Sequence, residues 1–183
     1  MIESPTDRSA RAWVLLISVV AAAFMLVFAA VASRRLGYPF ELEWLEGAGL
    51  AHLHRVLAGQ ALYVPPSLDF VPLNYTPLYF YVAALPARLF GEGFLALRLV
   101  SMLASLASFA LLFTLVRRET GRASAGLAAA GLYAATYRLS GGWFDIARAD
   151  SLHLCLVLGA IAVLRLDRHD WRASIVASAL LAL

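Results

Sequence analysis

The sequence predicts an all-α protein, a multi-pass transmembrane helical bundle with interfacial helices in its first outward loop. Hydrophobic residues make up 62% of the 183 residues and charged residues only 15%, and the mean hydropathy is +0.76. Soluble domains contain about 45–50% apolar and about 25% charged residues, so a single globular core could not bury this much apolar surface. Several uncharged stretches also have about the length that crosses a bilayer.

Apolar stretches with few charges set the order of the predicted spans. The first, residues 13–32, exceeds the roughly 7–15 apolar residues of a signal peptide and therefore predicts an uncleaved helix. Three further spans are predicted at 95–116, 122–139 and 151–166. The third span is rich in Ala and Gly, which is typical of a helix packed closely against its neighbours. A fifth span begins near residue 174 and stops at residue 183, so residues 1–183 are expected to be the N-terminal part of a single, truncated transmembrane domain.

Residues 70–87 are uncharged and long enough to cross, but they contain three prolines. Proline removes a helix hydrogen bond that lipid cannot replace, and the tyrosines of this stretch suit the water–lipid interface. A broken helix on or dipping into the membrane, near 76–90, is therefore favoured over a crossing helix. In that case the whole loop 33–94 faces outward.

Arginines indicate which side each loop occupies. The loops 117–122 and 165–172 hold six arginines between them. Because two spans separate these loops, they share a side, and the positive-inside rule makes that side cytoplasmic. Residues 140–150 are then extracytoplasmic.

A group of carboxylates follows the first span. Glu41, Glu43 and Glu46 lie within six positions beside the membrane. The apolar pattern over 43–58 predicts a helix on which Glu43 and Glu46 share a face with leucines. Placing a carboxylate on an apolar face costs free energy unless the group is paired with a cation, protonated, or used in catalysis or binding. The alternative is a frayed first turn in which the helix N-terminus stabilises the acidic side chain.

The other titratable residues exclude several classes of function. All fifteen basic residues are arginines, and because they lie singly or in pairs, no basic face for nucleic acid is predicted. His52, His54 and Arg55 are expected on a solvated or headgroup face without a third metal ligand. The sequence therefore predicts no metal site and no cofactor, and a divalent metal is an alternative that nothing in the sequence indicates. The single cysteine, Cys155, excludes a disulfide framework.

A second polar cluster, residues 143–151, lies at the predicted outer mouth of two spans. In a structural interpretation Asp150 caps the following helix and Asp145 pairs with Arg148. In a functional interpretation Arg148 binds an anion between two carboxylates, because the planar guanidinium suits phosphate.

Over about residues 13–166, the order and spacing of short motifs resemble the membrane glycosyltransferases of the GT-C superfamily. The resemblance is strongest to the family 39-like enzymes, which include protein O-mannosyltransferases and lipid A aminoarabinose transferases. The corresponding elements are Glu46-Gly47, Gly59-Gln60-Ala61-Leu62-Tyr63, Tyr75-Thr76-Pro77-Leu78-Tyr79-Phe80-Tyr81, Arg88-Leu89-Phe90-Gly91, Arg98-Leu99 and Arg148-Ala149-Asp150. The chain looks like a divergent branch, since Leu45-Glu46 replaces the usual Asp-Glu pair and Tyr75-Thr76-Pro77-Leu78 replaces Lys-Pro-Pro-Leu.

The resemblance implies an enzyme that moves a sugar from a polyprenyl-phosphate donor to a hydroxyl of a glycan, lipid or protein. The reaction would occur at the extracytoplasmic face of the cytoplasmic (inner) membrane, with the lipid bilayer as a partner. A non-enzymatic multi-pass membrane protein, such as a lipid-linked sugar transporter or an assembly subunit, is the alternative. A transporter would be expected to show repeated halves with paired broken helices, and the sequence has no such repeat.

The resemblance also implies roles for individual residues. Glu46 is the expected general base, with Glu43 as the alternative, and desolvation on the apolar face is expected to raise the pKa of Glu46. An arginine is expected to stabilise the leaving phosphate. Arg148 is the first choice for this contact, ahead of Arg88 and Arg55. Supporting roles are expected for Asp145, Asp150, Tyr75 and Tyr79.

Overall fold

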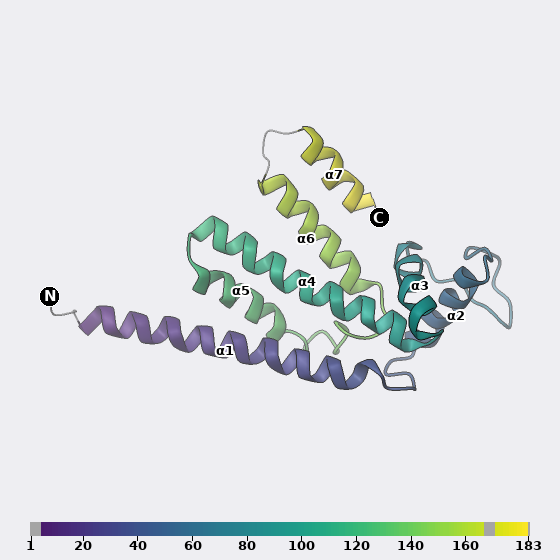
Figure 1. Ribbon diagram of the computed structural model, residues 1–183, viewed down its shortest axis with the longest axis horizontal. Coiled ribbons are helices and arrows are strands. Elements are labelled where there is room, and N and C mark those ends of the chain that lie inside the picture. Colours follow the sequence, from purple (N-terminus) through teal and green to yellow (C-terminus); the bar gives the residue numbers. More distant parts are fainter. Residues whose placement is uncertain (1–4, 167–170, 183) are drawn as a thin grey trace.

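The computed structural model describes residues 5–166 and 171–182, and this part of the chain forms seven helices and no strand. The helices are α1 (Pro5–Leu36), α2 (Leu45–Leu57), α3 (Leu78–Phe90), α4 (Phe94–Thr120), α5 (Ala123–Ala135), α6 (Asp150–Leu166) and α7 (Trp171–Ala182). Helix α5 packs on α1 and α4, α6 packs on α4, and α7 packs on α6 (Figure 1). The all-α bundle predicted from the sequence is confirmed.

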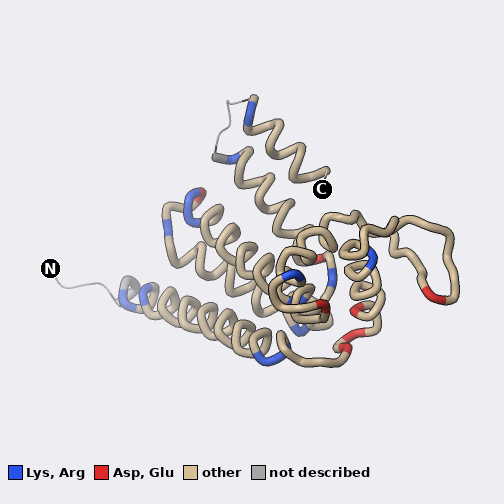
Figure 2. Tube along the Cα trace, turned by 45° about the vertical axis from the view of Figure 1, so that its right-hand side comes forward, with Lys and Arg blue, Asp and Glu red and all other residues tan. Residues whose placement is uncertain are grey.

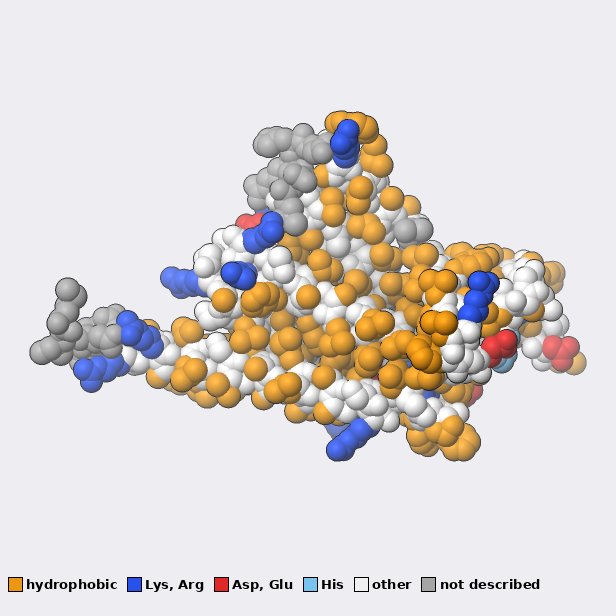
Figure 3. All heavy atoms as spheres, viewed as in Figure 1, with side chains coloured by type: hydrophobic (Ala, Val, Ile, Leu, Met, Phe, Trp, Pro, Cys, Tyr) orange, Lys and Arg blue, Asp and Glu red, His pale blue; other side chains and the backbone are white. Residues whose placement is uncertain are grey.

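Within the described residues, two helices are long and apolar enough to cross a membrane, namely α1 over Arg8–Leu36 and α4 over Phe94–Thr120. At 1.5 Å per residue each is about 40 Å long, which exceeds a hydrocarbon core of about 30 Å. Charged residues lie at the ends of the long helices, with uncharged stretches between them (Figure 2). Apolar side chains are spread along α1 on the visible face (Figure 3).

The helices at the third and fourth predicted spans, α5 (13 residues) and α6 (17 residues), are each shorter than the roughly 20 residues that cross a bilayer. Helix α5 ends at Ala135 instead of residue 139, and hydrogen-bonded turns carry the chain to Gly142. Gly141 and Gly142 both have positive φ, of 77° and 72°, a conformation that glycine adopts without strain. Helix α6 has 17 residues and matches its predicted range within one position.

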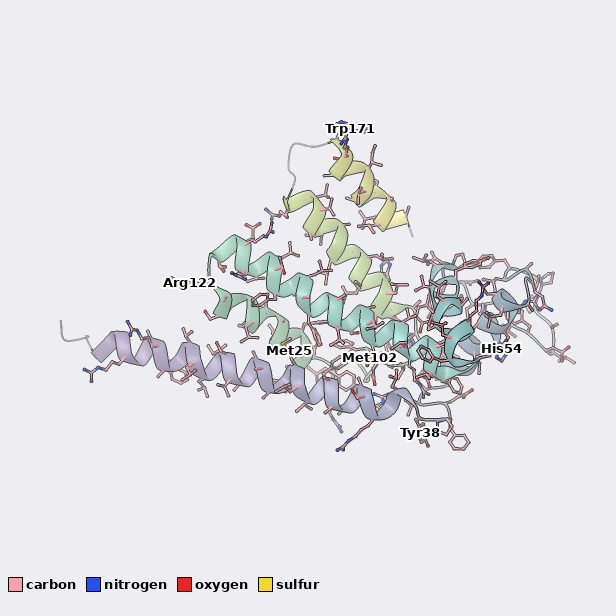
Figure 4. The ribbon with its side chains drawn as sticks, in the orientation of Figure 1. Met25, Tyr38, His54, Met102, Arg122 and Trp171 are labelled. Carbon is pink, nitrogen blue, oxygen red and sulfur yellow. The ribbon has the colours of Figure 1, made fainter. Side chains whose placement is uncertain are left out.

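Helices α2 and α3 lie together beside the end of α1 and the start of α4 (Figure 1). We call residues 37–93, which contain both helices and their connections, the cap. The labelled Tyr38 and His54 of the cap lie at the opposite end of the bundle from Arg122 (Figure 4). Residues 167–170 of the second arginine-rich loop, and residue 183, lie outside the described residues.

The proline-rich stretch does not form one continuous helix. Residues 70–77 are irregular and not helical, α3 begins after Pro77, and Pro86 lies inside the helix. With 13 residues, α3 is about 20 Å long and too short to cross a bilayer. The helix predicted near 76–90 is present within two positions of that range, and its interfacial placement stays a prediction.

The glycines of α5 allow close helix packing. A Cβ atom on Gly131 would lie 2.3 Å from the Cβ of Ala21 in α1, and one on Gly126 would lie 2.5 Å from the carbonyl oxygen of Phe113 in α4. Neither position has room for a side chain, so the glycines let the backbone of α5 pack directly against both long helices. The close packing predicted from the Ala and Gly content is confirmed.

Among the described residues, two clusters of buried apolar side chains meet at one connecting segment. One cluster joins α1, α4 and α5 around Phe28 and includes Phe144. The other joins α2, α3 and α4 around Leu97 and includes Ala147. The segment between α5 and α6 therefore runs from one cluster to the other, and this fixes the polar residues that it carries.

Candidate functional site

Glu46 lies in the first turn of α2 and is completely buried. Its Oε1 atom accepts hydrogen bonds from Arg98 Nε at 2.9 Å and from the backbone N–H of Ala147 at 2.7 Å. Its Oε2 atom accepts bonds from Arg98 Nη2 and from the backbone N–H of Leu42, both at 2.6 Å. Both oxygens are therefore engaged with groups of the protein itself.

Arg98, near the start of α4, is also completely buried. Besides the two bonds to Glu46, it donates to the backbone carbonyls of Arg35, Tyr38 and Phe40. A guanidinium has five N–H donors, so the three carbonyls and the two carboxylate oxygens match its full capacity. We call this pair the Arg98–Glu46 clamp, because it joins α4, α2 and the connection from α1 to α2.

The clamp sets the ionisation of Glu46. Burial on its own raises the pKa of this carboxyl group, but the hydrogen bonds from Arg98, Leu42 and Ala147 lower it by more, so the pKa lies below its usual value. The expectation of a raised pKa is wrong, because the apolar face of α2 meets a buried guanidinium and not only apolar groups. Glu46 is thus an ionised carboxylate that presents no surface to solvent.

Glu43 lies before α2, whose N-cap is Trp44. The prediction that both carboxylates share one helical face is therefore wrong. The Oε2 atom of Glu43 accepts a hydrogen bond from the backbone N–H of Leu45 at 3.0 Å, which stabilises the first turn of α2. Its side chain is 16% exposed and lies 3.5 Å from Arg148 Nη1.

Arg148 connects Glu43 to Asp150. Its Nε atom donates to Asp150 Oδ2 at 2.9 Å, and its guanidinium lies 4.1 Å from the centre of the Trp143 ring. Burial alone would lower the pKa of Arg148, but the hydrogen bond and charge of Asp150 raise it above the usual value, so the arginine stays protonated. We call Glu43, Arg148 and Asp150 the carboxylate–arginine cluster. Arg148 does lie between two carboxylates, but the first is Glu43 and not Asp145.

Two serines of α4 hold the segment that carries Arg148. Ser101 Oγ donates to the carbonyl of Arg148 at 3.0 Å, and Ser105 Oγ donates to the carbonyl of Phe144 at 2.6 Å. Both serines are fully buried, and their spacing of four residues places them on one face of the helix. Together with the bond from Ala147 to Glu46, these contacts fix the backbone that leads to Arg148.

Asp145 belongs to a different group of residues. Its Oδ1 atom accepts hydrogen bonds from Arg35 Nη1 at 3.0 Å and from the hydroxyl of Tyr137 at 2.8 Å. Its Oδ2 atom is buried and has no hydrogen-bond partner among the described residues. The predicted pair with Arg148 is therefore wrong, since Asp145 points toward α1.

The remaining predicted residues are spread over the cap. Tyr75 and Arg148 line the same small cavity, and the carbonyl of Tyr75 accepts a bond from the Tyr63 hydroxyl at 2.6 Å. The buried Tyr79 donates to the carbonyl of Leu97 at 2.9 Å, so it packs α3 against α4. Arg55 donates to the carbonyl of Ala61 at 2.8 Å and lies over Phe70. Arg88 is exposed in the last turn of α3, and no contact within the described residues joins it to the cluster.

The two histidines of α2 have different environments. His52 is buried between Phe70 and Phe80, and its Nε2 atom accepts a bond from the backbone N–H of Leu73 at 2.9 Å. The expectation of a solvated face is wrong for His52. Its hydrogen bond holds the backbone at Leu73 against α2. His54 is exposed and lies 3.6 Å from Glu92. No group of three His, Cys, Asp or Glu side chains that could hold a metal occurs in the described part of the chain.

A family model described as dolichyl-phosphate-mannose-protein mannosyltransferase matches residues 74–183. The matched region contains Arg98 and Arg148, whereas Glu43 and Glu46 precede it. No curated protein and no solved structure matches the chain. Because the match covers more than half of the sequence and agrees with the resemblance to GT-C glycosyltransferases, the chain belongs to the dolichyl-phosphate-mannose-protein mannosyltransferase family.

Proposed function

We propose that this chain transfers a sugar from a polyprenyl-phosphate donor to an acceptor hydroxyl at the extracytoplasmic face of the cytoplasmic membrane. The observation that carries the proposal is the carboxylate–arginine cluster, which combines a partly exposed carboxylate with a charged guanidinium beside the interfacial helices. Membership of a membrane glycosyltransferase family supports the reaction type. The family's description names a lipid-phosphate mannose donor and a protein acceptor, which favours a hexosyl donor and a protein among the acceptors considered.

Glu43 is the general base in this proposal. Both of its contacts use Oε2, and Oε1 has no hydrogen bond within the described residues. Oε1 takes the proton of the acceptor hydroxyl as the acceptor oxygen attacks the anomeric carbon of the sugar. The bond between that carbon and the phosphate oxygen breaks, and the polyprenyl phosphate leaves with the bonding electron pair. Glu46 was the first choice from the sequence, but its carboxylate already accepts four hydrogen bonds, two from Arg98 and two from the backbone N–H groups of Leu42 and Ala147.

Arg148 contacts the donor phosphate in this proposal. Its Nε and Nη1 atoms face Asp150 and Glu43, while Nη2 has no partner among the residues that the structure describes. A phosphate that meets Nη2 would gain a charge-assisted hydrogen bond, and the positive charge would stabilise the negative charge that develops on the leaving group. Trp143, under the guanidinium, holds it in place.

We expect Arg148→Ala to lower kcat for sugar transfer by about 10²–10³, as removal of one electrostatic donor does in other enzymes, and to weaken donor binding. The measurement is transfer of radiolabelled sugar from polyprenyl-phosphate donors in membranes that hold the intact protein. Arg88→Ala is the matched control, because Arg88 is exposed and lies outside the cluster, and it should retain near-normal activity. An Arg148→Ala protein that inserts normally and keeps full donor affinity would refute the phosphate contact.

We also expect cysteines at positions 67 and 140 to react with a membrane-impermeant thiol reagent from the same, extracytoplasmic side. The variants are Ser67→Cys and Ser140→Cys in a Cys155→Ser background, which removes the native thiol. Thr120→Cys, at the opposite end of α4, serves as the control and should react only after the membrane is permeabilised. Reaction of positions 67 and 140 from opposite sides would contradict the proposed topology.

A further inference from the structure

A groove lies between α1 and α5, away from the carboxylate–arginine cluster, and it has a volume of about 610 Å³. Four apolar residues of α1 line it, namely Phe24, Val27, Phe28 and Val31, and α5 contributes Ala134 and Ala135. The α1 residues follow the spacing i, i+3, i+4 and i+7, so they form one continuous face of the helix. The volume falls within the range of about 300–1,000 Å³ that is usual for ligand pockets.

One end of this groove is basic. Arg35, at the end of α1, and Arg138, after α5, both line it. All three hydrogen bonds of Arg35, to Tyr137, Gly142 and Asp145, use Nη1, so its Nε and Nη2 atoms have no partner among the described residues. Arg138 is exposed, and no ion pair of its side chain occurs within the described residues. Asp145 offsets one of the two positive charges, which leaves a net charge of about +1 at this end.

The length of the groove corresponds to one leaflet of a bilayer. From Phe24 to Arg35, α1 rises by about 16 Å, which is roughly half of a hydrocarbon core of about 30 Å. The uncharged part of α1 ends at Arg34 and Arg35, so the basic end lies where phospholipid phosphates are found. An apolar channel of one-leaflet length with a cationic end is complementary in shape and charge to a phospholipid that carries a net negative charge.

We propose that the groove between α1 and α5 binds one anionic phospholipid from the leaflet on the cap side. Its phosphate lies against Arg35 Nη2 or Nε and the guanidinium of Arg138, and one acyl chain follows Val31, Phe28 and Phe24 toward the bilayer centre. The proposal does not depend on the proposed reaction, because it requires only that α1 and α5 lie in a membrane. Asp145 connects the two regions, since it binds Arg35 and lies three residues before Arg148.

The test is lipid binding to the intact protein in detergent, followed by native mass spectrometry at about 0.15 M ionic strength. Phosphatidylglycerol and phosphatidylcholine with identical acyl chains are the probes. We expect phosphatidylglycerol to bind at least about tenfold more tightly than phosphatidylcholine. Arg138→Gln should weaken phosphatidylglycerol about fivefold, as expected for the loss of one interfacial arginine, and should leave phosphatidylcholine unchanged.

Two further variants separate a built site from a general effect of charge. Arg34→Gln removes the neighbouring arginine of α1, which does not line the groove, and it should change binding less than twofold. Ala135→Phe fills the groove without altering any charge, and it should weaken both phospholipids. Circular dichroism and gel filtration of each variant confirm folding, and Arg138→Gln keeps the test decisive if Ala135→Phe does not fold.

Three outcomes would overturn the proposal. One is equal binding of the two phospholipids to the wild-type protein. Another is an equal loss of phosphatidylglycerol binding in Arg34→Gln and Arg138→Gln, which would indicate a non-specific belt of charge. The third is displacement of phosphatidylglycerol by a stoichiometric amount of polyprenyl phosphate, which would make the groove a donor site. The first two outcomes do not bear on the roles proposed for Glu43 and Arg148, whereas the third would also contradict the donor-phosphate contact of Arg148.

Discussion

Arg98→Met is expected to lower the free energy of unfolding by about 3–5 kcal/mol, the usual cost of removing one partner from a buried ion pair. The substitution leaves the Glu46 carboxylate buried without its counter-charge. It also removes the donors to three backbone carbonyls. The measurement is denaturant or thermal unfolding of the purified protein in mixed micelles, with tryptophan fluorescence as the signal.

Two controls separate the clamp from a general loss of charge. The double variant Arg98→Met/Glu46→Leu removes both charges, so it should be more stable than Arg98→Met alone. Arg165→Met breaks an exposed ion pair with Glu119, whose atoms are 3.5 Å apart, and it should cost less than about 1 kcal/mol. Equal losses for Arg98→Met and Arg165→Met would show that the clamp does not stabilise the fold.

Glu43→Gln is expected to lower the turnover of sugar transfer by about 10²–10⁴, the usual effect of losing a general base. Glutamine keeps an oxygen for the backbone N–H of Leu45, so the start of α2 should be preserved. The matched control is Glu41→Gln, which changes an exposed carboxylate two residues earlier and should alter turnover by less than twofold. Turnover is measured with the radiolabelled donor, and the melting temperature of each variant is measured in parallel.

The comparison with Glu46→Gln decides between the two carboxylates. Because Glu46 is part of the clamp, Glu46→Gln should lower the melting temperature as well as the activity. Normal turnover in Glu43→Gln, together with an inactive Glu46→Gln protein of unchanged melting temperature, would assign the base to Glu46. Normal turnover in both variants would make the carboxylates structural and remove the residue-level support for the proposed reaction.

Local properties of the sequence predicted much of the architecture. The positions of α1, α4 and α6 follow from apolar stretches with few charges, because hydropathy indicates which segments can lie in lipid. The prolines of residues 70–87 exclude a continuous crossing helix for a local reason, the lost backbone hydrogen bond. The glycines of α5 predict close packing because they lack a side chain.

The candidate site was harder to predict from the sequence, because its contacts join residues far apart in the chain. The helical pattern over 43–58 correctly places Glu46 on a buried face, but it contains no information on Arg98, which is 52 positions later. An arginine near the end of a predicted span, with Ser101 and Ser105 on the following turns, was the available signal for a buried polar contact. Asp145 and Arg35 are 110 positions apart, so a local rule paired Asp145 with Arg148 instead.

The Arg98–Glu46 clamp imposes an order on the biogenesis of the protein. Every acceptor of Arg98 lies within residues 35–46, and these residues leave the ribosome well before Arg98 does. Until α4 enters the bilayer, the carboxylate of Glu46 and the three carbonyls must stay hydrated, so α2 cannot yet dock. Insertion of the second long helix supplies all five donors at once. The cap therefore reaches its final packing only after α4 has been synthesised.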